Sequence, residues 1–390
     1  MSFKRNIKQT FKLKPFYQKS GIYVMCLLIV FVSIGILTTI KPAYRFSSHA
    51  ITEWTSDIDS STFLYLLGRE NRVFQHAYPE DKAVPKLSTI FFQIVTNIKP
   101  DDPRSFLGQE VPGFSNFGQR IIVAGEGTSY ANLSIESSPP LEEVLKDREA
   151  ILDEDEEEEE VEEEEKEIDQ NTGDRDVVFI YNTHNRESFL PHLPDETDPD
   201  LAYHDEVNIT KVSEKLSKAL QANGIGTYVD ETDVTSLLHD KGWTYPKSYD
   251  ASRTIVEEAV ATNKDIEYII DLHRDSLPKD KTTKEINGED YAKILFVVGA
   301  EYDSYEKNLA LATELHYLIE EKYPGLSRGV LTKEGSGTNG VFNQDVLNNS
   351  LTIEMGGYDN TLEELYRSSD ALAEVFSDFY WDAEKVDAAQ

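Results

Sequence analysis

A run of twenty residues without a charged side chain sets the first constraint on how this chain can fold. Residues 21–40 read GIYVMCLLIVFVSIGILTTI. A helix of that length, at about 1.5 Å per residue, spans the roughly 30 Å hydrocarbon core of a bilayer. Residues 1–20 carry six Lys and Arg side chains and no acid, which predicts a basic cytoplasmic tail. We therefore expect a single-pass anchor in the cell membrane, with the rest of the chain outside the cytoplasm. A cleaved signal peptide is the alternative.

An acidic block divides the part of the chain that follows the apolar run. Thirteen of the fifteen positions in residues 153–167 are Asp or Glu. Such a block repels itself and buries too little apolar area to fold. We therefore expect residues 141–175 to be a flexible linker. It would join a small, mostly helical interaction segment, residues 41–140, to a folded domain, residues 176–390.

The composition excludes several classes of protein. The chain has 38 Lys and Arg residues against 72 Asp and Glu residues, a net charge of −34. A nucleic-acid binder would need a basic surface, so we expect no nucleic-acid partner. The chain has one Cys, Cys26, which lies in the apolar run. Any metal site outside that run must therefore use His, Asp and Glu.

Short apolar runs alternate with helical patterns from residue 176 onward. The strand-like runs are residues 177–182, 226–230, 267–273, 292–299 and 350–356, and the helical patterns are residues 207–222, residues 302–322 and the stretch that begins at residue 361. Strands that alternate with helices are typical of an α/β fold. We predict a largely parallel sheet covered by helices on both faces.

Polar side chains follow the predicted strands where an α/β sheet places its sites. His184 and Glu187 follow the first run, and His273 ends the third. Glu206 lies where the helix of residues 207–222 should begin. Two His and one carboxylate form the ligand set of a catalytic Zn²⁺, which leaves a position for a water of lowered pKa. On the pattern alone, the third ligand is either Glu187 or Glu206.

Two further positions fit the chemistry of a metal hydrolase. Glu354 lies in the last strand-like run, beside Gly356 and Gly357. Glycines let a substrate approach closely, so Glu354 fits the base that takes a proton from water and passes it to a leaving amine. Arg274 or Arg186 could stabilise a developing oxyanion or bind a substrate carboxylate.

Four separated motifs, in this order, resemble the stage II sporulation protein P family. They are YNTHNRESFLP (181–191), DLHRDS (271–276), RGV…GVFNQD (328–345) and IEMGGYDNT (353–361). The resemblance covers almost the whole chain, and that family is related to zinc N-acetylmuramoyl-L-alanine amidases. It implies a zinc amidase-like fold, with His184, Glu206 and His273 as metal ligands, and Glu354 as the catalytic residue. Here, however, Asn185, Arg186 and Glu187 follow the first His, a spacing that is similar to zinc carboxypeptidases, in which the Glu is a ligand.

The resemblance also implies a function. It indicates a membrane-anchored zinc enzyme that cleaves stem peptides from muramic acid and cleaves peptide cross-links. The enzyme would act in septal wall thinning and engulfment during endospore formation, with peptidoglycan and the stage II sporulation proteins D and M as partners. The alternatives are a carboxypeptidase-like enzyme that trims stem peptides and a non-catalytic scaffold that binds the cell wall.

Overall fold

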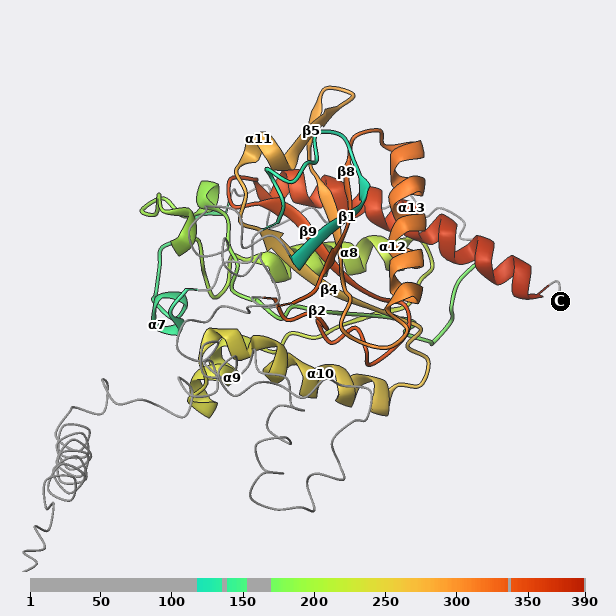
Figure 1. Cartoon of the computed structure of the whole chain (residues 1–390), viewed down its shortest axis with the longest axis horizontal. Helices are drawn as coiled ribbons and strands as arrows, with labels where there is room; N and C mark the ends of the chain where they lie inside the picture. The colour runs from blue at the N-terminus through green and yellow to red at the C-terminus, as the bar shows by residue number, and fades with distance from the viewer. Residues whose placement is uncertain (1–117, 135–138, 153–169, 336–337, 389–390) are drawn as a thin grey trace, which may run out of the picture. The chain divides into compact units, whose positions relative to one another are not determined.

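A seven-stranded sheet organises the residues that the computed structural model describes, which are 118–134, 139–152, 170–335 and 338–388 (Figure 1). The strand order is β1-β8-β7-β9-β4-β2-β3. These strands are β1 (Gln119–Ala124), β2 (Val178–Tyr181), β3 (Thr227–Val229), β4 (Tyr268–Asp275), β7 (Ile294–Gly299), β8 (Ser327–Lys333) and β9 (Ser350–Gly357). A separate hairpin consists of β5 (Thr283–Ile286) and β6 (Glu289–Ala292). Asn287 and Gly288, both at positive φ, form its turn.

Helices lie in several of the connections between the strands and after the last strand. The α-helices are α7 (Leu141–Val144), α8 (Ile209–Ala222), α9 (Val234–Lys241), α10 (Ser248–Thr262), α11 (Lys279–Thr282), α12 (Tyr305–Lys322) and α13 (Leu362–Ala388). The short 3-10 helices are η4 (Leu190–His192), η5 (Pro199–Leu201) and η6 (Tyr245–Lys247). The helix expected in residues 207–222 is α8, which begins after Asn208 because the Asn208 side chain accepts a hydrogen bond from the Thr210 N–H.

The sheet is mixed, because two of its strand pairs are antiparallel. The prediction of a largely parallel sheet is wrong for these two pairs. β2 pairs in parallel with β3 and β4, β4 with β9, and β7 with β8. β7 runs antiparallel to β9, and β1 runs antiparallel to β8. The reason lies between β4 and β7, where the chain forms only the short α11 and the β5–β6 hairpin. A parallel return needs a long crossover across one face of the sheet, and this connection provides none.

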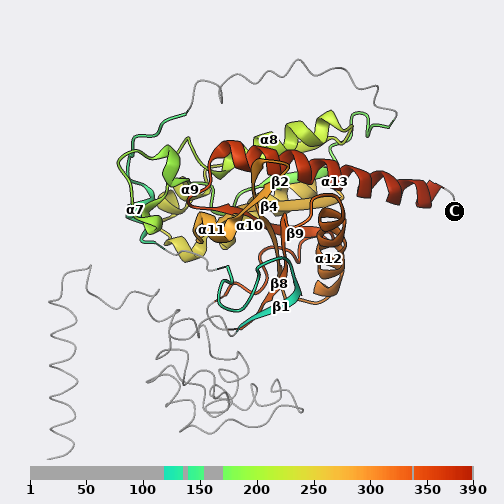
Figure 2. The same ribbon diagram turned by 90° about the horizontal axis from the view of Figure 1, so that it is seen from above.

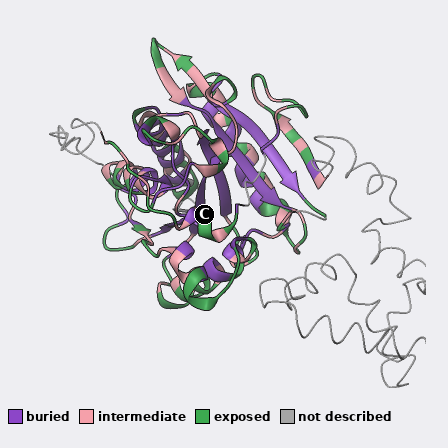
Figure 3. Cartoon of the chain, turned by 90° about the vertical axis from the view of Figure 1, so that its left-hand side faces the viewer, coloured by how far each residue is buried: buried purple, intermediate pink, exposed green. Residues whose placement is uncertain are grey.

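Helices cover both faces of the sheet, as expected for an α/β fold (Figure 2). On one face, α8, α12 and α13 pack through Leu216, Leu315 and Leu372, all of which are buried. On the other face, α10 packs through Val256 against Phe179 of β2. The central strands are buried along their whole length (Figure 3).

Residues before the acidic block also belong to this fold. β1 pairs with β8, and the segment after β1 buries Leu133 against Leu295 and Leu331 of the sheet. These residues fall within residues 41–140, for which the sequence predicts an interaction segment. Residues 1–117 and the acidic block itself lie outside the described residues. No helix in the described ranges is long and apolar enough to cross a membrane, and the run at residues 21–40 lies outside those ranges.

Candidate metal and catalytic site

His184 lies in the turn that follows β2, with 4% of its surface exposed. Its ring stacks on Tyr245, with the ring centroids 4.8 Å apart. The same turn carries Glu187, whose N–H donates a hydrogen bond to the His184 carbonyl. This turn therefore brings an imidazole and a carboxylate to the same end of the sheet, and the His184 Nδ1 lies 3.5 Å from the Glu187 Oε1.

His273 comes from the neighbouring strand β4 and is also buried. Its Nδ1 faces Glu187, 3.8 Å from Oε2, and its Nε2 lies 3.0 Å from Oδ1 of Asp271. Asp271 is itself held by the N–H and the hydroxyl of Thr183. Burial lowers the pKa of His273, but the negative charges of Asp271, Glu187 and Glu354 raise it to about 10. Asp271 therefore orients the ring with Nδ1 toward Glu187, which is how carboxylates orient metal-bound histidines.

Glu187 is buried and ionised. The peptide N–H of Arg274 donates a hydrogen bond to its Oε2 at 2.9 Å. Burial alone would raise the pKa of this carboxyl. The contact with His184, together with the positive charges of His184, His273 and Arg274, lowers it to about 2. The site therefore holds a fixed negative charge between two imidazoles.

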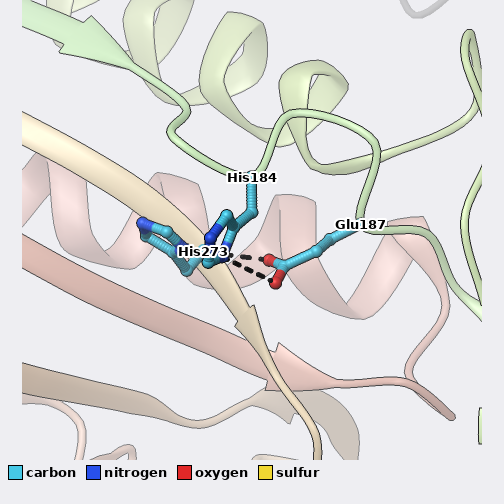
Figure 4. A group of neighbouring side chains, drawn as sticks. All are labelled: His184, Glu187 and His273. Atoms are coloured by element: carbon cyan, nitrogen blue, oxygen red, sulfur yellow. Dashed lines mark ion pairs between the residues drawn. The ribbon is translucent and has the colours of Figure 1, made fainter. Parts of the chain in front are cut away.

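These three side chains form the one group of His, Cys, Asp or Glu ligands, within the described ranges, that could hold a metal ion (Figure 4). One ligand atom from each of His184, Glu187 and His273 lies within 4.8 Å of the others. Two imidazoles and a carboxylate match the ligand set of a catalytic zinc, and the burial of all three suits a dry metal site. The donor set therefore fits Zn²⁺.

The structure does not bring Glu206 into this group, so the expectation that favoured it as third ligand is corrected. Glu206 is exposed, on a bend before α8. Its N–H donates a hydrogen bond to Nδ1 of His204, and Asn208 caps the N-terminus of the helix. Glu187 lies beside the two histidines instead, because its turn directly follows β2.

Glu354 lies on β9, beside His273 on the neighbouring strand β4. The two residues are direct partners in the parallel register, so their side chains share one face of the sheet. The hydroxyl of Ser134 donates a hydrogen bond to its Oε1 at 3.2 Å. Burial and the negative charge of Asp275 raise the pKa of Glu354 to about 7, while His273 and Lys333 lower it. A carboxyl with this pKa can accept and return a proton near neutral pH.

The two candidate arginines already have partners inside the protein. The Arg274 guanidinium donates to the carbonyls of Ala202 and Asp275. The Arg186 guanidinium pairs with Asp233 at 2.7 Å, at the start of α9. Arg274 therefore contacts Glu187 through its peptide N–H, and a catalytic role for its side chain stays a prediction.

Two buried polar residues beside this site, Asp271 and Ser134, were not predicted from the sequence. Asp271 lies two positions before His273, so the period of a strand places both on one face, and this signal could have identified it. Asp275, by contrast, was expected after the third predicted strand, and it pairs with the fully buried Arg328 at 2.5 Å. Ser134 lies 220 positions from Glu354, and no local pattern relates the two.

Comparisons with known proteins agree with the motifs in the sequence. The family model of stage II sporulation protein P (SpoIIP) matches residues 101–377. Stage II sporulation protein P of Bacillus subtilis is 45% identical over 370 residues, which cover 94% of this chain and 92% of the relative.

Two solved structures are more distantly similar. The N-acetylmuramyl-L-alanine amidase Ami1 of Mycobacterium smegmatis is 14% identical, with a TM-score of 0.31, over 54% of this chain and 98% of that chain. A mutant of murine aminoacylase 3 is 13% identical, with a TM-score of 0.30, over 52% of this chain and 62% of that chain. The family match and the high identity to the Bacillus subtilis protein decide the assignment: the chain belongs to the stage II sporulation protein P family.

Proposed function

We propose that this protein is a zinc-dependent peptidoglycan hydrolase, an N-acetylmuramoyl-L-alanine amidase that also cleaves peptide cross-links. The observation that carries the proposal is the buried group of His184, Glu187 and His273, with Glu354 on the adjacent strand. This is the ligand set of a zinc hydrolase together with a base of suitable pKa. Family membership supports a role in sporulation.

Each side chain has a distinct role in this proposal. His184, Glu187 and His273 would hold the zinc ion, which supplies a bound water whose pKa falls to about 7. Glu187 stays ionised because its pKa is about 2, and the Arg274 N–H fixes its orientation. Glu354 takes a proton from the attacking water, whose oxygen bonds to the carbonyl carbon. It then delivers that proton to the amide nitrogen as the carbon–nitrogen bond breaks, so the products are a carboxylic acid and a free amine.

A carboxypeptidase-like enzyme is the second candidate, because Glu187 lies beside His184 and His273 and could be a metal ligand. Such an enzyme also needs a cation that binds the terminal carboxylate of its substrate. The arginines beside the site are engaged inside the protein: Arg186 with Asp233, Arg328 with Asp275, and Arg274 with backbone carbonyls. With these three arginines engaged, family membership favours the amidase.

We also propose a location for the enzyme. We place it at the sporulation septum and the engulfing membrane, held by the apolar run at residues 21–40. The stage II sporulation proteins D and M are its proposed partners, and septal wall thinning is its proposed task. These proposals rest on the family resemblance and on the sequence of the anchor.

Digestion of purified peptidoglycan by the full-length protein in detergent tests the reaction. Mass spectrometry of the released fragments separates the candidates, because each enzyme leaves different ends. An amidase releases stem peptides with a free N-terminal alanine, and an endopeptidase releases uncross-linked peptides. A carboxypeptidase would release only single C-terminal amino acids. No release of any fragment by folded, zinc-loaded protein would support a scaffold and contradict the proposal.

A further inference from the structure

Residues 118–134, which we call the N-terminal arm, precede the acidic block in the sequence. They reach Glu354 on β9. The arm begins with β1 at the edge of the sheet. It then turns back so that Ser134 is fully buried beside Glu354.

Several contacts hold Ser134 beside Glu354. The side-chain amide of Gln119 donates a hydrogen bond to the carbonyl of Ser134 at 2.9 Å. The guanidinium of Arg328 donates to the carbonyl of Asn132 at 2.9 Å and also pairs with Asp275. Leu133 is buried between these anchors, against the apolar side chains of the sheet. The position of Ser134 is therefore set by the sheet itself.

The Ser134 hydroxyl has a specific target. Among the described residues, it is the one hydrogen-bond donor that reaches the Glu354 carboxyl, where it donates to Oε1. A hydrogen bond to one oxygen restricts rotation of a carboxyl group and leaves the other oxygen available for proton exchange. A buried carboxyl without that bond would be free to turn and would lose part of its alignment with the substrate.

We propose that Ser134 is a positioning residue, which holds the Glu354 carboxyl in the orientation needed for proton transfer. This inference rests on the proposed function, in which Glu354 is the base. It means that the catalytic site is completed by a residue from the far side of the acidic block. The enzyme then depends on the N-terminal arm as well as on the domain that follows the linker.

The test compares Ser134→Ala with wild-type, full-length protein in the digestion of peptidoglycan. We expect kcat to fall by about 10- to 100-fold, the effect of losing one hydrogen bond to a charged group. We expect KM and zinc content to stay unchanged, because Ser134 does not contact the metal group. Ser134→Thr keeps the hydroxyl and should recover most of the lost kcat.

Ser377→Ala is the matched control. Ser377 is also a buried serine, but its hydroxyl donates to the carbonyl of Ala373 within α13. The same chemical change there should leave kcat unchanged. If Ser134→Ala also leaves kcat unchanged, the inference is overturned while the proposed function stands. A wild-type protein that is folded, zinc-loaded and inactive would overturn both.

A double variant tests separately whether Ser134 acts through Glu354. Because Ser134 acts through Glu354, adding Ser134→Ala to Glu354→Gln should cause little further loss of kcat. Losses that multiply would show that Ser134 acts independently of Glu354, and would overturn the inference.

Discussion

Replacement of Glu187 by Gln tests the assignment of the third metal ligand. The amide has nearly the same shape as the carboxylate, and its oxygen can still accept the Arg274 N–H that now binds Oε2 at 2.9 Å. The fold should therefore survive. The change removes the one negative charge that the group of His184, Glu187 and His273 contributes to a cation.

The loss in zinc affinity follows from the dimensions of the group. Its ligand atoms lie within 4.8 Å of one another, so a cation held between them is closer than that to the Glu187 carboxylate. At about 4 Å and an effective dielectric constant of about 20, two unit charges interact by about 4 kcal/mol. Each 1.4 kcal/mol is about tenfold in a binding constant, so we expect zinc affinity to fall at least about 100-fold.

Glu206→Gln is the control, because Glu206 is exposed and lies outside the metal group. Competition with a chromophoric chelator measures the zinc affinity of both variants, and thermal denaturation confirms that they fold. We expect Glu206→Gln to bind zinc like the wild type. If Glu206→Gln lost zinc while Glu187→Gln kept it, the ligand assignment from the structure would be refuted.

Three further predictions concern Glu354, Asp271 and the hydrophobic core. Glu354→Gln should keep its zinc while turnover on peptidoglycan falls at least about 100-fold, and loss of zinc would instead make Glu354 a ligand. Asp271→Asn should weaken zinc binding by about 10- to 100-fold, because Asp271 orients His273; unchanged affinity in the same chelator assay would argue against that role. Leu216→Ala should lower the free energy of unfolding in urea by about 2–5 kcal/mol, because Leu216 is fully buried under the sheet. Leu237→Ala, at a half-buried position, should cost less, and an equal cost would contradict the assigned core.

The strands could be predicted best where the sequence has continuous apolar runs. β2, β4, β7 and β9 each fall within or overlap a predicted strand, because buried strands need apolar side chains on both faces. β8 was missed because it opens with Ser327 and Arg328 and contains Gly329 at a φ of +108°. α10 was missed because few large apolar side chains interrupt its Ser, Thr and Glu residues. The β5–β6 hairpin was also missed, although the Asn-Gly pair at its turn was a usable signal.

The site residues that lie in or directly after apolar strands could be predicted from the sequence. His184, His273 and Glu354 each adjoin a predicted strand, and the structure brings both histidines together. The choice between Glu187 and Glu206 depended on which way a loop turns after β2, which spacing alone does not determine. Ser134 reaches Glu354 only because β1 pairs with β8, and pairing between distant segments leaves no local pattern.

Stepwise addition of zinc to metal-free, full-length protein, with release of stem peptides from peptidoglycan measured at each step, tests the central claim most directly. The account predicts no release without metal, and release that rises until each chain has bound one zinc ion at the group of His184, Glu187 and His273. Metal-free protein that releases stem peptides as fast as zinc-loaded protein would contradict it.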